Sequence, residues 1–338
     1  MGIYDKKYDL MVFGEPMVQY TTKNNDITTA KLQNPSVGGE DIFVAATAAI
    51  HGFSSGFYSV IAKDPYENMI KNTLRKHNIS TDFCISANGF NGIEIVSDNN
   101  NETREFFYNR PPGFFNSPIP PNLDTKLLDQ CRMIYASSAF TLSSPEARSL
   151  VFESFYYAHN NGIFVAFDPN LRLHRHNSTY LRETLWMLMP FIDFFSVSAA
   201  SGEMQFMFAR DDLPENMPIE EKNDLTYDDM LFYRERNMKN CAMDLVKRNV
   251  QYATIRNGGE KVYFAYSDEK NKVQEGFIPV QKLENGFFSY SGAVFNGAFI
   301  SAILKEYSPG EAASYAANCA TKKCLLGNTL ASIFSTDA

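Results

Sequence analysis

Residues 163–172 read IFVAFDPNLR, an apolar run that ends in an aspartate, a proline and an asparagine. The run from Ile163 to Asp168 is short and rich in β-branched and aromatic residues, which is typical of a strand buried on both faces of a parallel sheet. In open α/β sheets, ligands bind at the carboxyl ends of such strands. The stretch therefore predicts a binding site beside Asp168 and Asn170, although a plain Asp-Pro turn has the same signature.

Five similar runs lie on either side of this strand in the sequence. They are Tyr8–Gly14, Ser55–Ala62, Met133–Ser137, Asp193–Ser198 and Tyr252–Arg256. Helical patterns follow most of them, and Ser144-Pro145 supplies an N-cap and a first-turn proline for a helix that should end near Asn160. Strands that alternate with helices predict an α/β fold with a mainly parallel sheet covered by helices.

Two segments interrupt this alternation. In residues 91–108, the runs GIEIVSD and TREFFYN flank a polar turn, which predicts a β-hairpin. Residues 210–237 are rich in charges and prolines and precede a helix predicted at Asn240–Arg248, so we expect a surface insertion there. With no internal repeat and no low-complexity linker, one domain over residues 1–338 is the simplest organisation.

Composition excludes several classes of partner. A net charge of -8 over 338 residues, without a dense basic stretch, disfavours nucleic acid. No stretch reaches the roughly 18 apolar residues of a membrane span, and the amino-terminal residues do not resemble a secretion signal. The five cysteines form no CxxC pair and no metal-ligand pattern, so we expect reduced thiols, a cytoplasmic location and no structural metal.

Glycine pairs and small-residue helices complete the pattern. Gly38-Gly39 precedes an alanine-rich helix predicted at Phe43–His51, and the run Gly292–Phe299 begins another helix, which is followed by a last helix predicted at Ala312–Leu326. With the DPNLR run, their order and spacing resemble the PfkB family of carbohydrate kinases, most closely the 2-keto-3-deoxygluconate kinase and fructokinase branch. The resemblance implies a ribokinase-like three-layer α/β/α sandwich with a small β lid, formed by about residues 15–36 and 88–112.

The resemblance also assigns candidate site residues. It places a sugar or sugar acid against Gly38, Gly39, Tyr108, Arg110, Asn170 and Arg172. Guanidinium groups suit carboxylates and hydroxyls, although both arginines could be solvated surface residues. It implies ATP and Mg²⁺ as cofactors, with Arg256, Gly258, Gly259 and Asn318 on the nucleotide side. A simple hairpin turn explains the Gly258-Gly259 pair equally well.

The phosphoryl-transfer signature of the family, DTTGAGDxF, is degenerate in this chain. An ungapped alignment places it over Phe287–Phe295, where Gly292 is the one glycine that remains. Tyr290 replaces the first glycine of an anion hole, and Ala293 replaces the aspartate that acts as the general base. Losing a general base costs about 10²–10⁴ in rate, and losing one oxyanion donor about 10²–10³. The aromatic residues here could fill an emptied phosphate site or simply pack in the core.

Further departures concern the metal and the substrate. Ser198 and Ser201 stand where the family has an NxxE motif that organises magnesium, with Glu203 close enough to substitute in part. Phe43 stands where many relatives have a substrate-facing asparagine. Substitute bases could come from Asp168, Glu40, Asp41, His174 or His176.

Two functions follow as expectations. The first is a catalytically impaired or inactive family member that acts by binding, and the second is a working carbohydrate kinase with a non-standard base. In this family the lid hairpin often pairs with that of a second subunit, so the resemblance also implies a homodimer.

Overall fold

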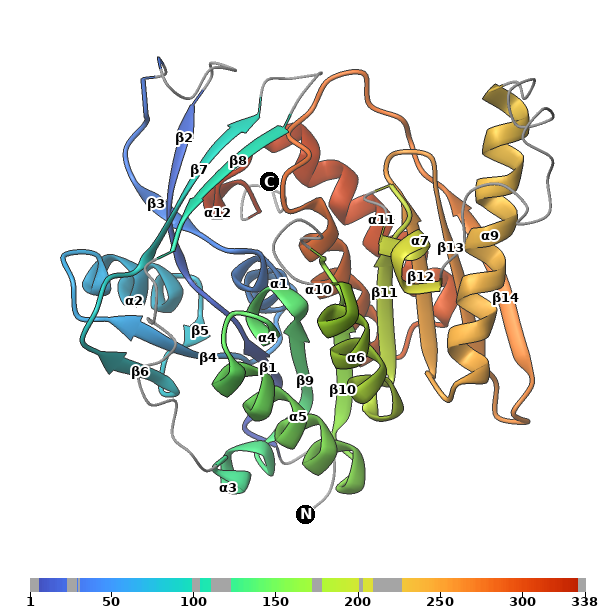
Figure 1. Ribbon diagram of the computed structural model, residues 1–338, viewed down its shortest axis with the longest axis horizontal. Coiled ribbons are helices and arrows are strands. Elements are labelled where there is room, and N and C mark those ends of the chain that lie inside the picture. Colours follow the sequence, from blue (N-terminus) through green and yellow to red (C-terminus); the bar gives the residue numbers. More distant parts are fainter. Residues whose placement is uncertain are drawn as a thin grey trace.

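The computed structural model describes residues 6–22, 29, 31–98, 104–110, 123–171, 178–200, 203–208 and 227–333. A ten-stranded sheet forms its centre, in the order β14–β13–β12–β11–β10–β9–β1–β4–β5, with β6 paired to β4 (Figure 1). The strands are β1 (Tyr8–Phe13), β4 (Ser55–Ala62), β5 (Ile79–Ser80), β6 (Cys84–Ala87), β9 (Cys131–Ser137), β10 (Phe164–Asp168), β11 (Phe194–Ser198), β12 (Tyr252–Asn257), β13 (Lys261–Ser267) and β14 (Val273–Pro279).

The strands from β12 to β4 run parallel, and all six buried strands expected from the sequence lie among them. Their carboxyl ends therefore meet at one edge of the sheet, the edge at which α/β proteins bind ligands. Beyond β12 the chain turns back, because β12, β13 and β14 pair antiparallel.

Helices cover both faces of the sheet, and each face has its own apolar core. One face carries α3 (Thr125–Leu128), α4 (Ser138–Thr141), α5 (Pro145–Asn160), α6 (Ser178–Leu188), the short 3₁₀ helix η3 (Met189–Phe191), α7 (Glu203–Phe208) and α9 (Tyr227–Lys247). The other carries α1 (Glu40–Ile50), α2 (Glu67–Lys76), α10 (Ser291–Leu304), α11 (Pro309–Leu326) and α12 (Leu330–Ile333). This is the predicted three-layer α/β/α arrangement.

A second sheet of four strands, β3–β2–β7–β8, stands beside the main sheet (Figure 1). It consists of β2 (Met17–Thr22), β3 (Ser36–Gly38), β7 (Gly92–Asp98) and β8 (Arg104–Asn109), and we call it the lid. The predicted hairpin is present as the antiparallel pair β7–β8, while β2 and β7 pair parallel.

Several predicted boundaries differ from the structure. Helix α1 begins at Glu40, three residues before the predicted Phe43, because Gly39 ends the preceding segment with a φ of 102° and two acidic residues occupy the first turn. Helix α9 begins at Tyr227 and not at Asn240, so the end of the expected surface insertion is helical. The rest of that segment, residues 210–226, lies outside the described residues. The predicted cap of α5 is present, with Ser144 Oγ accepting from Ala147 N at 3.0 Å.

All five cysteines are thiols outside any disulfide, and three of them are buried. Within the described ranges, no helix combines the length and apolar composition that a membrane crossing requires.

Candidate functional site

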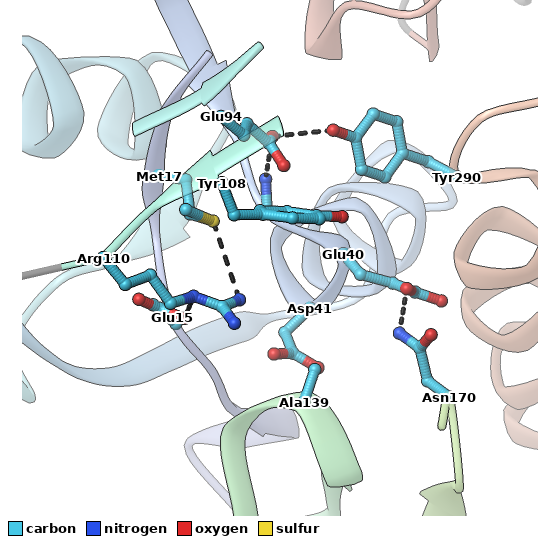
Figure 2. A pocket seen from close by; sticks show the side chains of 11 residues that line it. Glu15, Met17, Glu40, Asp41, Glu94, Tyr108, Arg110, Ala139, Asn170 and Tyr290 are labelled. Carbon is cyan, nitrogen blue, oxygen red and sulfur yellow. Dashed lines mark hydrogen bonds and ion pairs between the residues drawn. The ribbon is translucent and has the colours of Figure 1, made fainter. Parts of the chain in front are cut away.

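A pocket lies between the lid and the carboxyl edge of the main sheet, and Figure 2 shows the side chains around it. Strand ends supply part of its wall, since Glu15 follows β1, Ala139 follows β9 and Asn170 follows β10. The lid and the starts of α1 and α10 supply the rest: Met17, Gly39, Glu40, Asp41, Glu94, Tyr108, Arg110 and Tyr290. The cavity measures about 30 Å³, which is room for one or two water molecules.

On the lid side, Arg110 is held by an ion pair. Its Nε lies 2.8 Å from Glu15 Oε2, and Glu15 is only 5% exposed. The guanidinium also lies over the Tyr108 ring, 5.2 Å from its centroid, and Nη2 is 3.8 Å from Met17 Sδ. Because Glu15 neutralises the Arg110 charge, this arginine offers a ligand directed hydrogen bonds and little net positive potential.

Asn170 lies across the pocket from the lid, in the turn that the sequence placed after Asp168. Its φ is 31°, and its backbone N–H donates to Asp168 Oδ1 at 2.9 Å, so the Asp-Pro turn expected as an alternative is present. Its side-chain amide donates to Glu40 Oε2. The turn and the site coincide, because the same turn directs the amide of Asn170 to the wall of the pocket.

Tyr290 connects the start of α10 to the lid. Its hydroxyl donates to Glu94 Oε1 at 2.6 Å and accepts from Gln19 Nε2 at 2.9 Å. Its ring stacks on Phe43 with the centroids 4.2 Å apart and an interplanar angle of 12°. Phe43 and Tyr290, two aromatic residues singled out in the sequence, are thus in direct contact, and the Tyr290 side chain packs against the lid.

Two buried carboxyl groups of the pocket have raised pKa values. Burial raises the pKa of Asp41 to about 7, against a smaller lowering by Ser137, and Asp41 Oδ1 has no hydrogen-bond partner among the described residues. Burial also raises the pKa of Glu94 to about 7, although the hydrogen bond from Tyr290 lowers it. Both groups therefore exchange protons near neutral pH, in the range suited to acid–base chemistry.

An ion pair stands at the amino terminus of α10, the place of the expected anion hole. Arg256 Nη2 lies 2.7 Å from Asp168 Oδ2, and the same oxygen accepts from Asn296 Nδ2 at 2.6 Å. The guanidinium lies so close to Gly292 that any side chain there would collide with it. Ala293, in the first turn of the helix, is fully buried and carries no proton acceptor.

The expected magnesium position does not fit a metal. Glu203 accepts the backbone N–H of Leu171 through Oε1 and that of Ser198 through Oε2, both at 3.0 Å. Its carboxylate ties together the ends of β10 and β11, and Ser198 has no carboxylate to offer. Across the described part of the chain, no cluster of three His, Cys, Asp or Glu side chains could hold a metal ion. Ser201 lies outside the described residues.

The residues assigned to a nucleotide lie at the end of β12, in the turn after it and on α11. Gly258, with a φ of 51°, and Gly259 form the turn between β12 and β13, as the hairpin alternative predicted. Asn318 is exposed on α11. The Arg256 guanidinium donates to Asp168, which the sequence analysis named as a possible substitute base and not as part of a nucleotide site.

Of the residues assigned to the substrate, Gly39, Tyr108, Arg110 and Asn170 line one pocket. Gly38 is not part of this lining, but a side chain there would meet Glu94, which is. Arg172, His174 and His176 lie outside the described residues. No sequence pattern indicated a role for Glu94, Gln19, Asn296 or Lys323. A glutamate inside the strand pattern of residues 92–98 was the one available signal for Glu94, because a charged residue on a covered strand face requires a partner.

The fold and the pocket define a class: an α/β protein that binds its ligand at the carboxyl edge of a parallel sheet, beneath a β lid. A family model described as pfkB family carbohydrate kinase matches residues 7–334, so this chain belongs to that family.

Solved structures agree on the ribokinase-like fold. The 2-dehydro-3-deoxygluconokinase of Thermotoga maritima has a TM-score of 0.74 at 16% identity, over 96% of this chain and 98% of its own. A putative ribokinase from E. coli in complex with ATP and Mg²⁺ has a TM-score of 0.74 at 15% identity, over 97% and 98% of the two chains.

Among curated proteins, the similarity is to plant fructokinases. A probable chloroplastic fructokinase-6 of Arabidopsis thaliana is 25% identical over 167 residues, which is 48% of this chain and 43% of that protein. Fructokinase-2 of Zea mays is 25% identical over 164 residues, 48% of this chain and 49% of that protein. The chain spans about half the length of the curated relatives it matches.

Proposed function

We propose that this pfkB-family protein binds a sugar between the lid and the sheet edge, where the cavity of about 30 Å³ must widen to admit it, and that its phosphoryl transfer is lost or strongly reduced. The observation that carries the proposal is the start of α10. There Ala293, which the resemblance aligns with the catalytic aspartate of the family, is buried and carries no proton acceptor, and the Arg256–Asp168 ion pair lies against Gly292, where an anion hole would need open space. Both changes act on catalysis, while the pocket wall keeps its polar groups.

Asp168 is poorly suited to replace the missing base. Its Oδ2 accepts from Arg256 and Asn296, and its Oδ1 accepts from the Asn170 backbone. A carboxylate whose two oxygens already accept three hydrogen bonds within the protein is poorly placed to accept a proton from a substrate hydroxyl as well. Without a base, the rate of transfer falls by about 10²–10⁴.

Asp41 supports the second candidate function, an active kinase with a non-standard base. It lines the pocket, its pKa is raised to about 7 by burial, and its Oδ1 has no hydrogen-bond partner among the described residues. A base of this pKa works well near neutral pH.

The charges around the pocket favour a neutral sugar over a sugar acid. Glu15, Glu40, Asp41 and Glu94 line it, and Arg110 is already paired with Glu15. An incoming carboxylate would meet more negative than positive charge, whereas sugar hydroxyls can both donate to the carboxylates and accept from Arg110 and Asn170.

Release of ADP tests both candidates. The native protein is incubated with ATP, magnesium and either fructose or 2-keto-3-deoxygluconate, beside Ala293→Asp, its isosteric control Ala293→Asn, and Asp41→Asn. We expect no sugar-dependent turnover in the native protein. Turnover near or above about 1 s⁻¹, in the usual range of enzymes, would refute the loss of catalysis. If Asp41→Asn then abolished that turnover, the second candidate would be correct.

We also propose that the protein forms a homodimer through the lid. Strand β8 is an edge of the lid sheet, and Phe107 on this strand is 52% exposed. Exposed apolar edges favour pairing with a second sheet. We expect light scattering to give a dimer mass for the native protein and a monomer mass for Phe107→Lys, with Phe277→Lys on β14 as the control for an equally exposed phenylalanine. A native monomer would contradict the proposal.

A further inference from the structure

We propose that Tyr290, Glu94 and Gln19, here called the Tyr290 latch, serve as a built-in ligand of the pocket and select what the site accepts. A sugar hydroxyl can bind at the lid side only by displacing the Tyr290 hydroxyl from Glu94 and Gln19. The inference rests on the proposed sugar-binding function, because it concerns the same pocket.

The hydrogen bonds of the latch span the pocket wall. The Tyr290 hydroxyl donates to Glu94 on β7 (Figure 2). It also accepts from Gln19 on β2, so two strands of the lid are joined to the start of α10. Glu94 and Gln19 are 1% and 0% exposed. Buried polar groups of this kind need partners, and the phenol supplies them when no sugar does.

Glu94 also forms a hydrogen bond with the Gly38-Gly39 pair. Its Oε1 accepts the backbone N–H of Gly39 at 3.0 Å, a donor that faces the pocket. One carboxylate oxygen thus takes both the Gly39 amide and the Tyr290 hydroxyl. These two donors would be available to a ligand only after Glu94 moves or exchanges its partners.

The tyrosine ring is held firmly enough to compete with a ligand. It stacks on Phe43 and meets Phe106 of the lid edge to face, with centroids 6.1 Å apart and an interplanar angle of 85°. The backbone of Tyr290 has a φ of 62°, a left-handed conformation that is unfavourable for a residue with a Cβ. Packing and hydrogen bonds to the lid stabilise that conformation.

Lys323 fixes the segment that carries the tyrosine. This lysine is 0% exposed, and its ammonium donates to the carbonyls of Phe287 and Ser289 and to Asn328 Oδ1. Three oxygen acceptors compensate for burying the charge. Residues 287–289 are therefore anchored, and movement of the latch is confined to the Tyr290 side chain and the lid.

Hydrogen exchange tests the latch without any ligand. Tyr290→Phe removes the hydroxyl and keeps the ring, and we expect the amides of β7 to exchange about tenfold faster, since the hydrogen bond from Tyr290 to Glu94 joins β7 to the start of α10. The matched control is Tyr20→Phe, which removes another lid-to-body bond, Tyr20 to Tyr66 at 2.8 Å, at a distance from the pocket lining. Amides of β9 report any global loss of stability. Unchanged β7 exchange in Tyr290→Phe would overturn the proposal.

Calorimetry with fructose tests selection. We expect Tyr290→Phe and Tyr290→Gly to bind fructose at least about tenfold more tightly than the native protein or Tyr20→Phe, and the glycine suits a φ of 62°. Equal affinity in all variants would overturn the selective role. If no variant binds fructose or 2-keto-3-deoxygluconate, the proposed function fails, and the exchange measurement alone then decides whether the latch exists.

Discussion

Replacing Arg256 by methionine is expected to lower the free energy of unfolding by about 3–5 kcal/mol, because it leaves the carboxylate of Asp168 buried without its counter-charge. Asp168 is 1% exposed, and the ion pair is 2.7 Å long. Urea unfolding followed by circular dichroism measures the change. Asn296 still donates to Asp168, so folding should be weakened and not abolished.

Arg132 provides the control for this prediction. It pairs with Asp9 at 3.0 Å, but about a fifth of each side chain is exposed, so Arg132→Met should cost only about 1 kcal/mol or less. The double variant Arg256→Met, Asp168→Asn should recover much of the loss, since it removes both charges. If Arg256→Met lowers the free energy of unfolding no more than Arg132→Met does, other groups must compensate the buried charge of Asp168.

Replacing Asp41 by asparagine is expected to stabilise the protein at pH 8 by up to about 4 kcal/mol. Burial raises the pKa of Asp41 from 3.8 to about 7, so the folded state holds a proton over this interval that the unfolded state has released. Stability therefore falls as pH rises from about 4 to about 7. Asparagine removes this cost above pH 7, and the gain should nearly vanish at pH 4.

Urea unfolding at pH 4.5 and pH 8 measures the difference. Asp82 is the control of opposite sign, because its hydrogen bonds with Lys7 and Tyr8 lower its pKa, so Asp82→Asn should give no gain at pH 8. A gain for Asp41→Asn that is equal at both pH values would show that folding does not raise the pKa of Asp41. Asp41 thus lowers the stability of the folded protein above pH 7, and a functional role in the pocket would explain why an acid is kept there.

The sequence predicted the central strands well because their signal is local. A mostly apolar run such as Ser55–Ala62, in which two serines are the polar residues, is buried in full, so composition alone marks its bounds. Helix α9 was placed too late because its first turns are charged, and a charged segment resembles a surface insertion when its packing partner is unknown. The start of α1 depends on a positive φ at Gly39, which an apolar pattern cannot indicate.

The candidate site was predictable only in part, for a different reason. The positions of Gly39, Arg110 and Asn170 around one pocket follow from strand order and from the resemblance. Their partners do not, since Glu94 and Tyr290 lie 196 positions apart along the chain and are joined by a single hydrogen bond. Packing across the sheet edge pairs one arginine with Glu15 and another with Asp168. No local sequence pattern indicates which acid each arginine contacts.

The burial of Lys323 has a consequence for the order in which the protein is made. Its ammonium secures the carbonyls of residues 287 and 289, yet it belongs to α11, which leaves the ribosome later. A nascent chain that has emerged only as far as α10 therefore carries Tyr290 on a segment that Lys323 does not yet hold. The lid has been synthesised by then, but its hydrogen bond with Tyr290 lacks this support. The pocket is completed late in synthesis, so a ribosome pause within α11 would extend the period in which its acidic wall is open to other molecules.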